Sequence, residues 1–332
     1  MQTNTVEGQH KHPPVVVIIP NWNGRHFIVD CLRSISELHY PRERLQIVVV
    51  DNGSLDGSQE AIRSQFDQMR AAGFGSLQLI ENESNAGAPA AYNQAIQLAD
   101  PACEYIWKLD NDVTLDPESL QGLIGVHRSL IHENVGGVGG RIRNVRAGGD
   151  DPIGARLMPC PRRWTKIVEY VYADTTEQRS DFLEELDMVS GSCCLFSRRA
   201  FRDHGEFDDR FFLYYDDTEL CLRFRKNGWR FFVTHRAQVY HHGLSSTASI
   251  PGCRLYYWLR NHLLLGKCFF EGVERLLFYA VHVTNIPWKL FRIGHRYAAG
   301  RYILVAVTMA RAYRDFILGR YGPCPDNISD FG

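Results

Sequence analysis

Between residues 15 and 142 the sequence alternates between short runs of β-branched residues and longer segments with the apolar periodicity of helices. This alternation constrains the fold most, because such repeats bury their apolar faces in a mostly parallel sheet with helices on both sides. The predicted strands are 15–20, 45–51, 77–81, 105–110 and the glycine-rich 135–140. The predicted helices are 25–38, 56–66, 88–99 and 117–130. The sequence therefore predicts an α/β fold.

After residue 142 the pattern changes twice. Residues 143–185 are rich in Arg, Gly and Pro and lack clear periodicity, which predicts a functional loop or lid. Regular structure is expected to resume with a strand at 188–197, a loop at 205–212, a helix at 216–228 and two short strands, RFFVT and QVYHHG. From about residue 250 the chain is predicted to be helical and carries many aromatic residues. Its apolar stretches are well short of the ~20 residues that cross a bilayer.

Polar and turn-forming residues follow four of the predicted strands. They are Asn21 after the first strand, Asp51 and Asn52 after the second, Asn85 and Gly87 after the third, and Asp110, Asn111 and Asp112 after the fourth. Turn formation explains any one of these groups by itself. In open α/β sheets, however, ligands bind beyond the carboxyl ends of the strands. Four such groups at one edge of the sheet predict a binding site.

Two groups of carboxylates have the spacing of a catalytic or metal site. Asp110 and Asp112 can direct two hard oxygen ligands at one point, which suits Mg²⁺ or Mn²⁺. Asp216 and Asp217 open the helix predicted at 216–228. Acidic residues in a first turn cap a helix and complement its dipole, but one of them at this junction can also serve as a general base. His241 is either structural or an imidazole ligand.

The composition and the absence of certain motifs argue against several classes of protein. The formal net charge of −1 gives no field for a general nucleic-acid binder. Neither a GxGxxG nor a GxxxxGK[ST] loop occurs in the required context, which argues against a nicotinamide dehydrogenase and a P-loop kinase. The nine cysteines form no CxxC pair, as expected of reduced cysteines in a cytoplasmic protein. Residues 1–13 are polar, lack the apolar core of a secretion signal, and are predicted to be disordered.

Eight motifs occur together in one order along the chain. They are IIPNWNG, VVVDNGSLDGS, NAGAPAAYNQAI, LDNDV, VSGSCCLFSR, GEFDDRFF, YYDDTELCLRFRKNG and VYHHG. In order and approximate spacing the chain resembles the family 2 inverting glycosyltransferases, most of all their rhamnosyltransferase-like branch. The resemblance implies a GT-A fold over residues 14–250, in which a Rossmann-like nucleotide-binding half and an acceptor half share one mixed central sheet. A helical C-terminal extension would occupy residues 251–332.

The resemblance also implies roles for individual residues. Those expected to bind the donor nucleotide are Pro20, Asn21, Asp51, Asn52, Asn85, Gly87, Asn93, Asp110 and Asn111. A divalent cation, Mg²⁺ or Mn²⁺, would be held by Asp110, Asp112 and His241. Asp217 lies where the family keeps its catalytic base. Gly191, Ser192 and Asp216 would line the sugar and acceptor pocket.

The implied activity is sugar transfer from a nucleotide-sugar donor to a hydroxyl of a glycan or polyprenyl-linked acceptor in cell-surface polysaccharide synthesis. The expected donor is dTDP-rhamnose, with a UDP-hexose, a UDP-N-acetylhexosamine or a GDP-sugar as alternatives. A non-catalytic nucleotide-sugar or carbohydrate-binding module is the alternative of another class.

The C-terminal segment favours two further partners. Residues 272–322 contain eight basic and two acidic residues, so the aromatic helices predicted there can lie on an anionic membrane. The alternative is that they pack on the catalytic domain or form a homodimer. A cytoplasmic location at the inner face of the cell membrane is the corresponding expectation.

Overall fold

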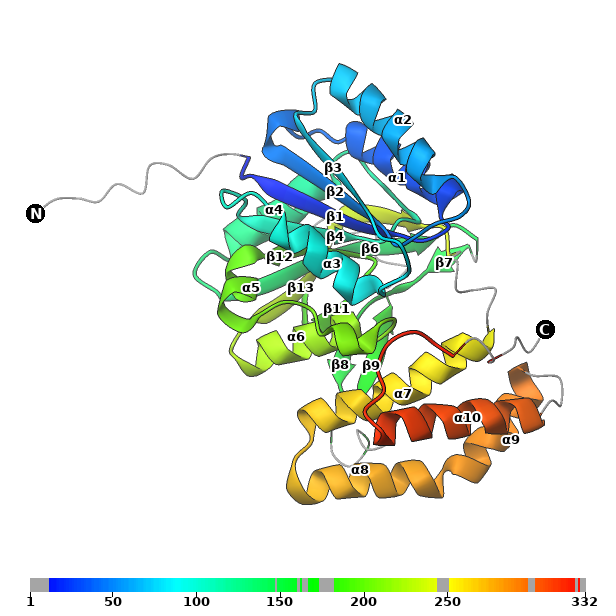
Figure 1. Ribbon diagram of the computed structural model, residues 1–332. Coiled ribbons are helices and arrows are strands. Elements are labelled where there is room, and N and C mark those ends of the chain that lie inside the picture. The colour runs from blue at the N-terminus through cyan, green and yellow to red at the C-terminus, as the bar shows by residue number, and fades with distance from the viewer. Residues whose placement is uncertain are drawn as a thin grey trace, which may run out of the picture.

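A single mixed sheet lies at the centre of the molecule (Figure 1). The computed structural model describes residues 12–146, 148–159, 162, 167–172, 182–243, 251–297, 302–325 and 328. Residues 1–11, most of the segment predicted to be disordered, lie outside the described residues.

The central sheet contains ten strands in the described part of the chain. They are β1 (Val15–Asn21), β2 (Leu45–Asp51), β3 (Ser76–Glu81), β4 (Tyr105–Leu109), β5 (Val113–Leu115), β6 (Val135–Asn144), β7 (Gly149–Asp150), β10 (Leu183–Leu186), β12 (Cys193–Ser197) and β13 (Arg230–His241). The main order is β10-β13-β6-β12-β4-β1-β2-β3. Strands β4, β1, β2 and β3 are parallel, whereas β12 runs antiparallel to both β4 and β6. The sheet is therefore mixed, as the resemblance implies.

Helices cover both faces of this sheet. They are α1 (Arg25–Ser36), α2 (Ser58–Ala71) and α4 (Ser119–Ser129) on one face, with α3 (Ala88–Gln97), α5 (Arg198–His204) and α6 (Asp216–Lys226) on the other. Alternate residues of β1 explain why both faces are covered: Val15 and Val17 belong to one core, and Val16 to the other. Short 3₁₀ helices occur at Arg42–Arg44 and Asp209–Phe211. The predicted strands and helices before residue 142 are confirmed.

The region after residue 142 differs from the prediction. Within 143–185, which was expected to be irregular, β8 (Pro152–Leu157) and β9 (Val168–Tyr172) form a second sheet with β11 (Met188–Val189). In β9 only Val168 is buried, Val171 is partly buried and the other three residues are exposed, so the strand has no regular apolar alternation and its signal is weak. The strand predicted at 188–197 is split into β11 and β12, and the two short strands after residue 229 form the single strand β13.

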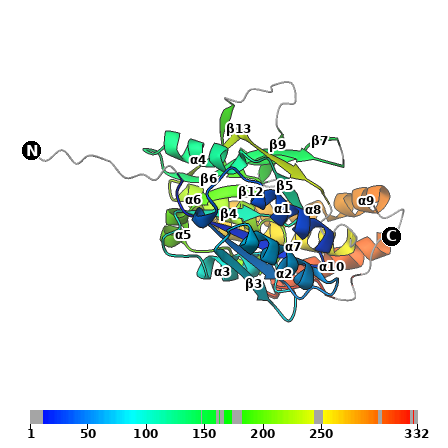
Figure 2. The same ribbon diagram turned by 90° about the horizontal axis from the view of Figure 1, so that it is seen from above.

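Four helices form a layer below the sheet in Figure 1. They are α7 (Pro251–Phe269), α8 (Gly272–Thr284), α9 (Ile286–Tyr297) and α10 (Tyr302–Ile317). Helix α7 buries Leu263, Leu264 and Leu265 in the same core as α6, so this layer is packed onto the sheet domain. In the view from above, α9 and α10 extend to one side of the sheet (Figure 2). None of the helices in the described part of the chain combines the length and apolar character that a bilayer crossing requires.

Candidate active site

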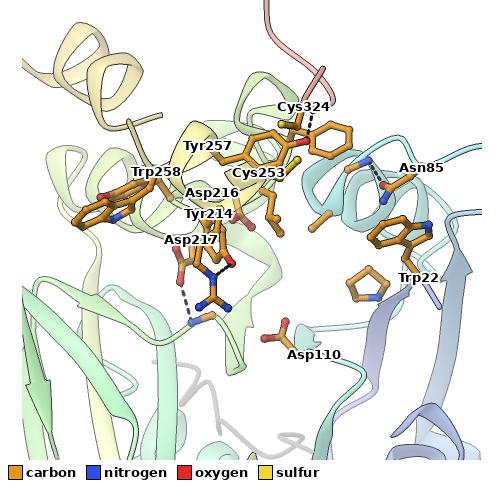
Figure 3. Close-up of a pocket in the computed structure, with 18 of the residues that line it drawn as sticks. Trp22, Asn85, Asp110, Tyr214, Asp216, Asp217, Cys253, Tyr257, Trp258 and Cys324 are labelled. Atoms are coloured by element: carbon orange, nitrogen blue, oxygen red, sulfur yellow. Dashed lines mark hydrogen bonds between the residues drawn. The ribbon is translucent and has the colours of Figure 1, made fainter. Parts of the chain in front are cut away.

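A cavity of about 1250 Å³ opens at the carboxyl ends of β1, β2 and β4, between the sheet and the C-terminal helices (Figure 3). Most of the residues that the resemblance assigns to the site line this cavity. They are Pro20, Asn21, Asn52, Asn85, Gly87, Asp110, Asn111, Asp112, Gly191, Ser192, Asp216, Asp217 and His241. The topology brings them together because parallel strands end at one edge of the sheet, where polar side chains replace the apolar core.

Two of the predicted donor-binding residues, Asp51 and Asn93, do not line the cavity. The buried Asp51 carboxylate accepts a hydrogen bond of 2.8 Å from the Asn21 side chain, which also accepts one of 2.7 Å from Asn111. Asn93 exchanges two hydrogen bonds with the backbone of Phe207. In this structure both residues therefore hold neighbouring segments in place, and Asp51 fixes the orientation of Asn21.

Asp110, Asp112 and His241 form a group suited to a metal ion. One potential ligand atom from each residue lies within 4.8 Å of the others. Antiparallel pairing of β13 with β5 brings His241 opposite Val113, and therefore beside Asp112. The second carboxylate oxygen of Asp112, Oδ2, is buried and has no hydrogen-bond partner. A buried, unpartnered carboxylate oxygen beside a second carboxylate and an imidazole fits Mn²⁺ or Mg²⁺.

His241 is oriented by a residue that the sequence analysis missed. Its Nδ1 lies 2.6 Å from Asp151 and its Nε2 lies 3.3 Å from Asp112. Burial alone would lower the pKa of His241, but hydrogen bonds to Asp112 and Asp151 and the charge of Asp110 raise it to about 9. A carboxylate on the far nitrogen is the usual way of orienting a histidine ligand. The acidic pair at 150–151 was the available signal, but it lies in the segment that lacked periodicity.

Asp216 and Asp217 lie in the first turn of α6, on the other side of the cavity from Asp110 (Figure 3). The Asp217 carboxylate accepts hydrogen bonds from the backbone N–H groups of Gly191, at 3.0 Å, and Thr218, at 2.7 Å. A Cβ atom at Gly191 would come within 2.6 Å of Asp217 Oδ2, so glycine permits this close approach. Burial raises the pKa of both aspartates, and the nearby Lys108 ammonium acts against this rise.

Lys108 is a buried cation beneath these carboxylates. Its Nζ donates to the Gly191 carbonyl, lies 3.5 Å from Asp110 and lies 4.4 Å from the centre of the Tyr92 ring. Burial alone would lower the pKa of Lys108, but its interactions with Tyr92 and with the charges of Asp110, Asp216 and Asp217 outweigh burial and hold that pKa well above its usual range. Lys108 therefore compensates part of the negative charge around the cavity.

The loop before α6 is held in an unusual conformation by the C-terminal helices. Phe212, Tyr214 and Tyr215 have positive φ angles of 57°, 65° and 67°, which bulky residues rarely adopt. The buried side-chain amide of Asn261, on α7, donates to the carbonyls of Phe211 and Leu213, at 2.5 and 2.7 Å. Helix α7 thus fixes the segment that leads directly into Asp216 and Asp217.

The C-terminal helices and the segment after α10 also supply one wall of the cavity, which the sequence analysis did not assign to them. The wall residues include Cys253, Arg254, Leu255, Tyr257, Trp258, Ile293, Pro323, Cys324 and Ile328. The aromatic run RLYYWLRN lies in this segment of the sequence, but its contact with the loop before α6 depends on tertiary packing.

Comparison with known proteins identifies the family. Residues 16–205, more than half of the chain, match the model of glycosyl transferase family 2. An N-acetylglucosaminyl-diphospho-decaprenol L-rhamnosyltransferase of Mycobacterium tuberculosis is 30% identical over 248 residues, which cover 67% of this chain and 75% of the relative. The galactofuranosyltransferase GlfT2 of Mycolicibacterium smegmatis is 22% identical over 273 residues, 78% of this chain and 41% of that protein.

Solved structures show the same fold. The mannosyltransferase PcManGT of Pyrobaculum calidifontis, in complex with GDP-Man and Mn²⁺, has a TM-score of 0.54 at 18% identity and covers 93% of this chain and 83% of its own. S. aureus TarS 1–349 has a TM-score of 0.55 at 14% identity, with 92% and 82% covered. Together with the mixed sheet and the helical C-terminal part, these matches show that the chain is a glycosyltransferase of family 2 with the GT-A fold.

Proposed function

We propose that this enzyme transfers a sugar, with inversion, from a nucleotide-sugar donor to a hydroxyl of a lipid-linked or glycan acceptor in polysaccharide synthesis. The observation that carries the proposal is the placement of the half-buried Asp217 carboxylate across one cavity from Asp110, Asp112 and His241. A divalent cation bound by Asp110, Asp112 and His241 would stabilise the negative charge of the leaving nucleoside diphosphate.

In the proposed reaction Asp217 accepts the proton of the acceptor hydroxyl while that oxygen attacks the anomeric carbon. Attack from the face opposite the leaving group inverts the anomeric centre. Asp217 suits this task because burial raises its pKa while two backbone N–H groups fix its position. Asn21, Asn52 and Asn111 offer amide groups at the strand ends, where the nucleotide would bind.

The proposed donor is dTDP-rhamnose, supported by the 30% identical rhamnosyltransferase. The alternatives are a GDP-sugar or a UDP-sugar, since the similar structures include complexes with GDP-Man and with UDP-GlcNAc. A thermal-shift panel of these nucleotide sugars with Mn²⁺ tests the choice. The correct donor at ~100 times its dissociation constant should add about 2.7 kcal/mol to the free energy of unfolding.

Transfer itself is tested by acceptor-dependent release of the nucleoside diphosphate. Release that requires both the matching donor and a polyprenyl-diphosphate sugar acceptor supports the proposal. Binding of the nucleotide sugar without any release would favour the non-catalytic binding module instead.

A lipid-linked acceptor is supported by the apolar side of the cavity and by the relative's diphospho-decaprenol substrate. Leu255, Ile293 and Ile328 line the cavity on the side of the C-terminal helices. Ile293 belongs to α9, which also carries the exposed residues Trp288 and Phe291. An acceptor whose diphosphate lies in the cavity could therefore pass its hydrocarbon chain along α9 toward a membrane.

We further propose that α8 and α9 contact the cytoplasmic face of an anionic membrane. Val273, Leu276, Val283, Trp288 and Phe291 have exposed fractions of 71%, 69%, 59%, 59% and 55%, and they recur every three to seven residues along these helices. The eight basic and two acidic residues of 272–322 complement anionic lipid. The alternative is that this surface joins two copies of the chain, and vesicle binding distinguishes the two possibilities.

A further inference from the structure

The cavity is lined by more acidic than basic side chains. Four carboxylates, those of Asp110, Asp112, Asp216 and Asp217, face two permanently basic groups, those of Lys108 and Arg254. The Lys108 side chain is nearly inaccessible and is already paired with Asp110 and the Gly191 carbonyl. Arg254 is different, because in the described part of the chain no carboxylate lies within 4 Å of its exposed guanidinium.

Arg254 is oriented by a hydrogen bond, although no described residue gives it an acidic partner. Its Nε donates a hydrogen bond of 3.1 Å to the hydroxyl of Tyr214, drawn as a dashed line in Figure 3. This bond occupies one side of the guanidinium, and no described residue accepts a hydrogen bond from Nη1 or Nη2, so the donors of these two nitrogens are available. A planar pair of donors in this arrangement matches two oxygens of a phosphate group.

The residue that orients Arg254 is itself held in a strained backbone conformation. Tyr214 has a φ of 65°, and its carbonyl accepts a hydrogen bond of 3.1 Å from the buried Asn261 side chain. A bulky residue adopts this φ only where surrounding contacts impose it, and such strain concentrates at ligand-binding segments. The loop that carries Tyr214 also leads into Asp217, so one loop positions both the carboxylate and Arg254.

We propose that Arg254 is a phosphate-binding residue that holds the diphosphate of a substrate through the NH₂ groups of Nη1 and Nη2. The inference rests on the proposed function, in which both substrates carry a diphosphate: the donor as a nucleoside diphosphate and the acceptor as a polyprenyl diphosphate. A diphosphate entering among four carboxylates needs positive charge on more than one side. Arg254 supplies that charge on the wall formed by α7.

Calorimetric titrations of Arg254→Met, Arg254→Lys and Tyr214→Phe test this role. In the first arm the probes are dTDP and dTMP with Mn²⁺. In the second arm they are farnesyl diphosphate and farnesol, added with dTDP at saturation. Loss of a charged hydrogen-bonding pair should weaken diphosphate binding by Arg254→Met roughly 10- to 100-fold. Binding of farnesol, which carries no phosphate, should be unchanged.

The two arms identify the source of the diphosphate. Weaker binding of dTDP, with dTMP less affected, places Arg254 on the donor, whereas weaker binding of farnesyl diphosphate alone places it on the acceptor. Arg254→Lys keeps the charge without the planar pair of donors, so an intermediate loss is expected. Tyr214→Phe should give a smaller loss, because it releases the guanidinium from its fixed orientation.

The matched control is Arg70→Met on the exposed face of α2, where Arg70 pairs with Asp67. It should bind every probe as the unmodified protein does. Equal binding of both diphosphates by Arg254→Met and the unmodified protein would overturn the proposal. If Arg254→Met does not fold, unchanged binding in both Arg254→Lys and Tyr214→Phe overturns it instead. A protein that binds dTDP through Arg254 but transfers no sugar would contradict only the proposed function.

Discussion

Asp217 and Asp216 are adjacent in sequence, but their surroundings separate their roles. Asp217 accepts two backbone hydrogen bonds, which stabilise its ionised form, and it lies against Gly191. For Asp216, burial and the neighbouring Asp217 charge are the largest causes of a raised pKa. Of the two, Asp217 is therefore better suited to be the ionised base.

The first prediction concerns this base. Asp217→Asn should leave a folded protein that binds its nucleotide, because the amide is isosteric with the carboxylate. It should lower kcat by about 10²- to 10⁴-fold, the usual contribution of a positioned base. Steady-state release of the nucleoside diphosphate measures the effect, and Asp216→Asn is the matched comparison. Near-normal turnover by Asp217→Asn would remove Asp217 from this role.

A second prediction concerns the residue behind the metal site. Asp151→Asn removes the charge that orients His241 through a contact of 2.6 Å. Loss of such a partner typically weakens metal affinity by about 10- to 100-fold. The Mn²⁺ concentration for half-maximal activity should rise by that factor, while activity at saturating Mn²⁺ largely recovers. Asp67→Asn, at an exposed site on α2, should leave the Mn²⁺ dependence unchanged. An unchanged dependence in Asp151→Asn would contradict the assignment.

These residues also show where sequence patterns are informative. Asp110 and Asp112 could be placed from sequence because they follow a buried strand, whose position is fixed by its apolar run. Asp151 could not, because the segment around it has no strong period. Arg254 lies in a predicted helix, but its contact with Tyr214 joins residues 40 positions apart and depends on tertiary packing. Asp51 and Asn93 illustrate a further difficulty, since their side chains support the site from behind instead of lining it.

Among the elements, α7 connects the layer of C-terminal helices with the loop before α6. Arg260 and Asn261 are fully buried, and both bond to backbone carbonyls of the loop before α6. The sequence predicted helices after residue 250 from their periodicity. It gave no reason to connect them with Asp217, and only the packing of α7 shows that connection.

A third prediction follows from this contact. Asn261→Ala removes the amide that donates to the carbonyls of Leu213 and Tyr214, which should lower the free energy of unfolding by about 1–3 kcal/mol. It should also lower kcat more than it raises the KM for the donor, because the loop that positions Asp217 loosens. Asn227→Ala, at the exposed end of α6, is the control. A stability loss with normal kcat would show that Asn261 is merely structural.

The exposed apolar side chains of α8 and α9 support a fourth prediction. Trp288→Ser combined with Phe291→Ser should reduce co-sedimentation with vesicles containing anionic lipid, since each buried aromatic side chain contributes about 1.5–3 kcal/mol. The partition coefficient should fall at least about tenfold. The control is Leu55→Ser, a change at a 95% exposed position on the loop before α2. Equal binding by the double variant and the unmodified protein, or binding that ignores lipid charge, would contradict the proposal. Sedimentation velocity without vesicles tests whether the unmodified protein is a dimer and whether the double variant is not.

At the scale of the whole molecule, the site lies between the sheet and the layer of C-terminal helices. The sequence predicts the sheet in more detail than the helical layer. The sheet half follows from strand and helix periodicity and supplies Asn21, Asp110 and Asp112. The helical layer supplies Arg254 and Trp258, whose positions depend on how α7 packs against the loop before α6. The division near residue 250 stays a prediction, although the shared core of α6 and α7 indicates that the two layers unfold together.

A fifth prediction tests this coupling through pH. The buried His282 of α8 contacts the half-buried His262 of α7, with ring centres 4.9 Å apart, and the Lys289 ammonium of α9 lies 3.0 Å from His282. Burial lowers the pKa of His262 to about 3 and that of His282 to about 2. The unfolded chain therefore binds more protons than the folded one below the usual histidine pKa of about 6.5. Stability is complete above that pH and is lost as pH falls.

Each such histidine should decrease the free energy of unfolding by about 1.4 kcal/mol per pH unit below pH 6. His282→Gln removes one of these groups and keeps a polar partner for Lys289, so the pH dependence between pH 6 and pH 4.5 should become shallower by that amount. Urea unfolding at several pH values measures the slope. His39→Gln, at an exposed position, should leave it unchanged. Equal slopes in His282→Gln and the unmodified protein would mean that this contact opens before the molecule unfolds, so that the helical layer and the sheet are not one cooperative unit.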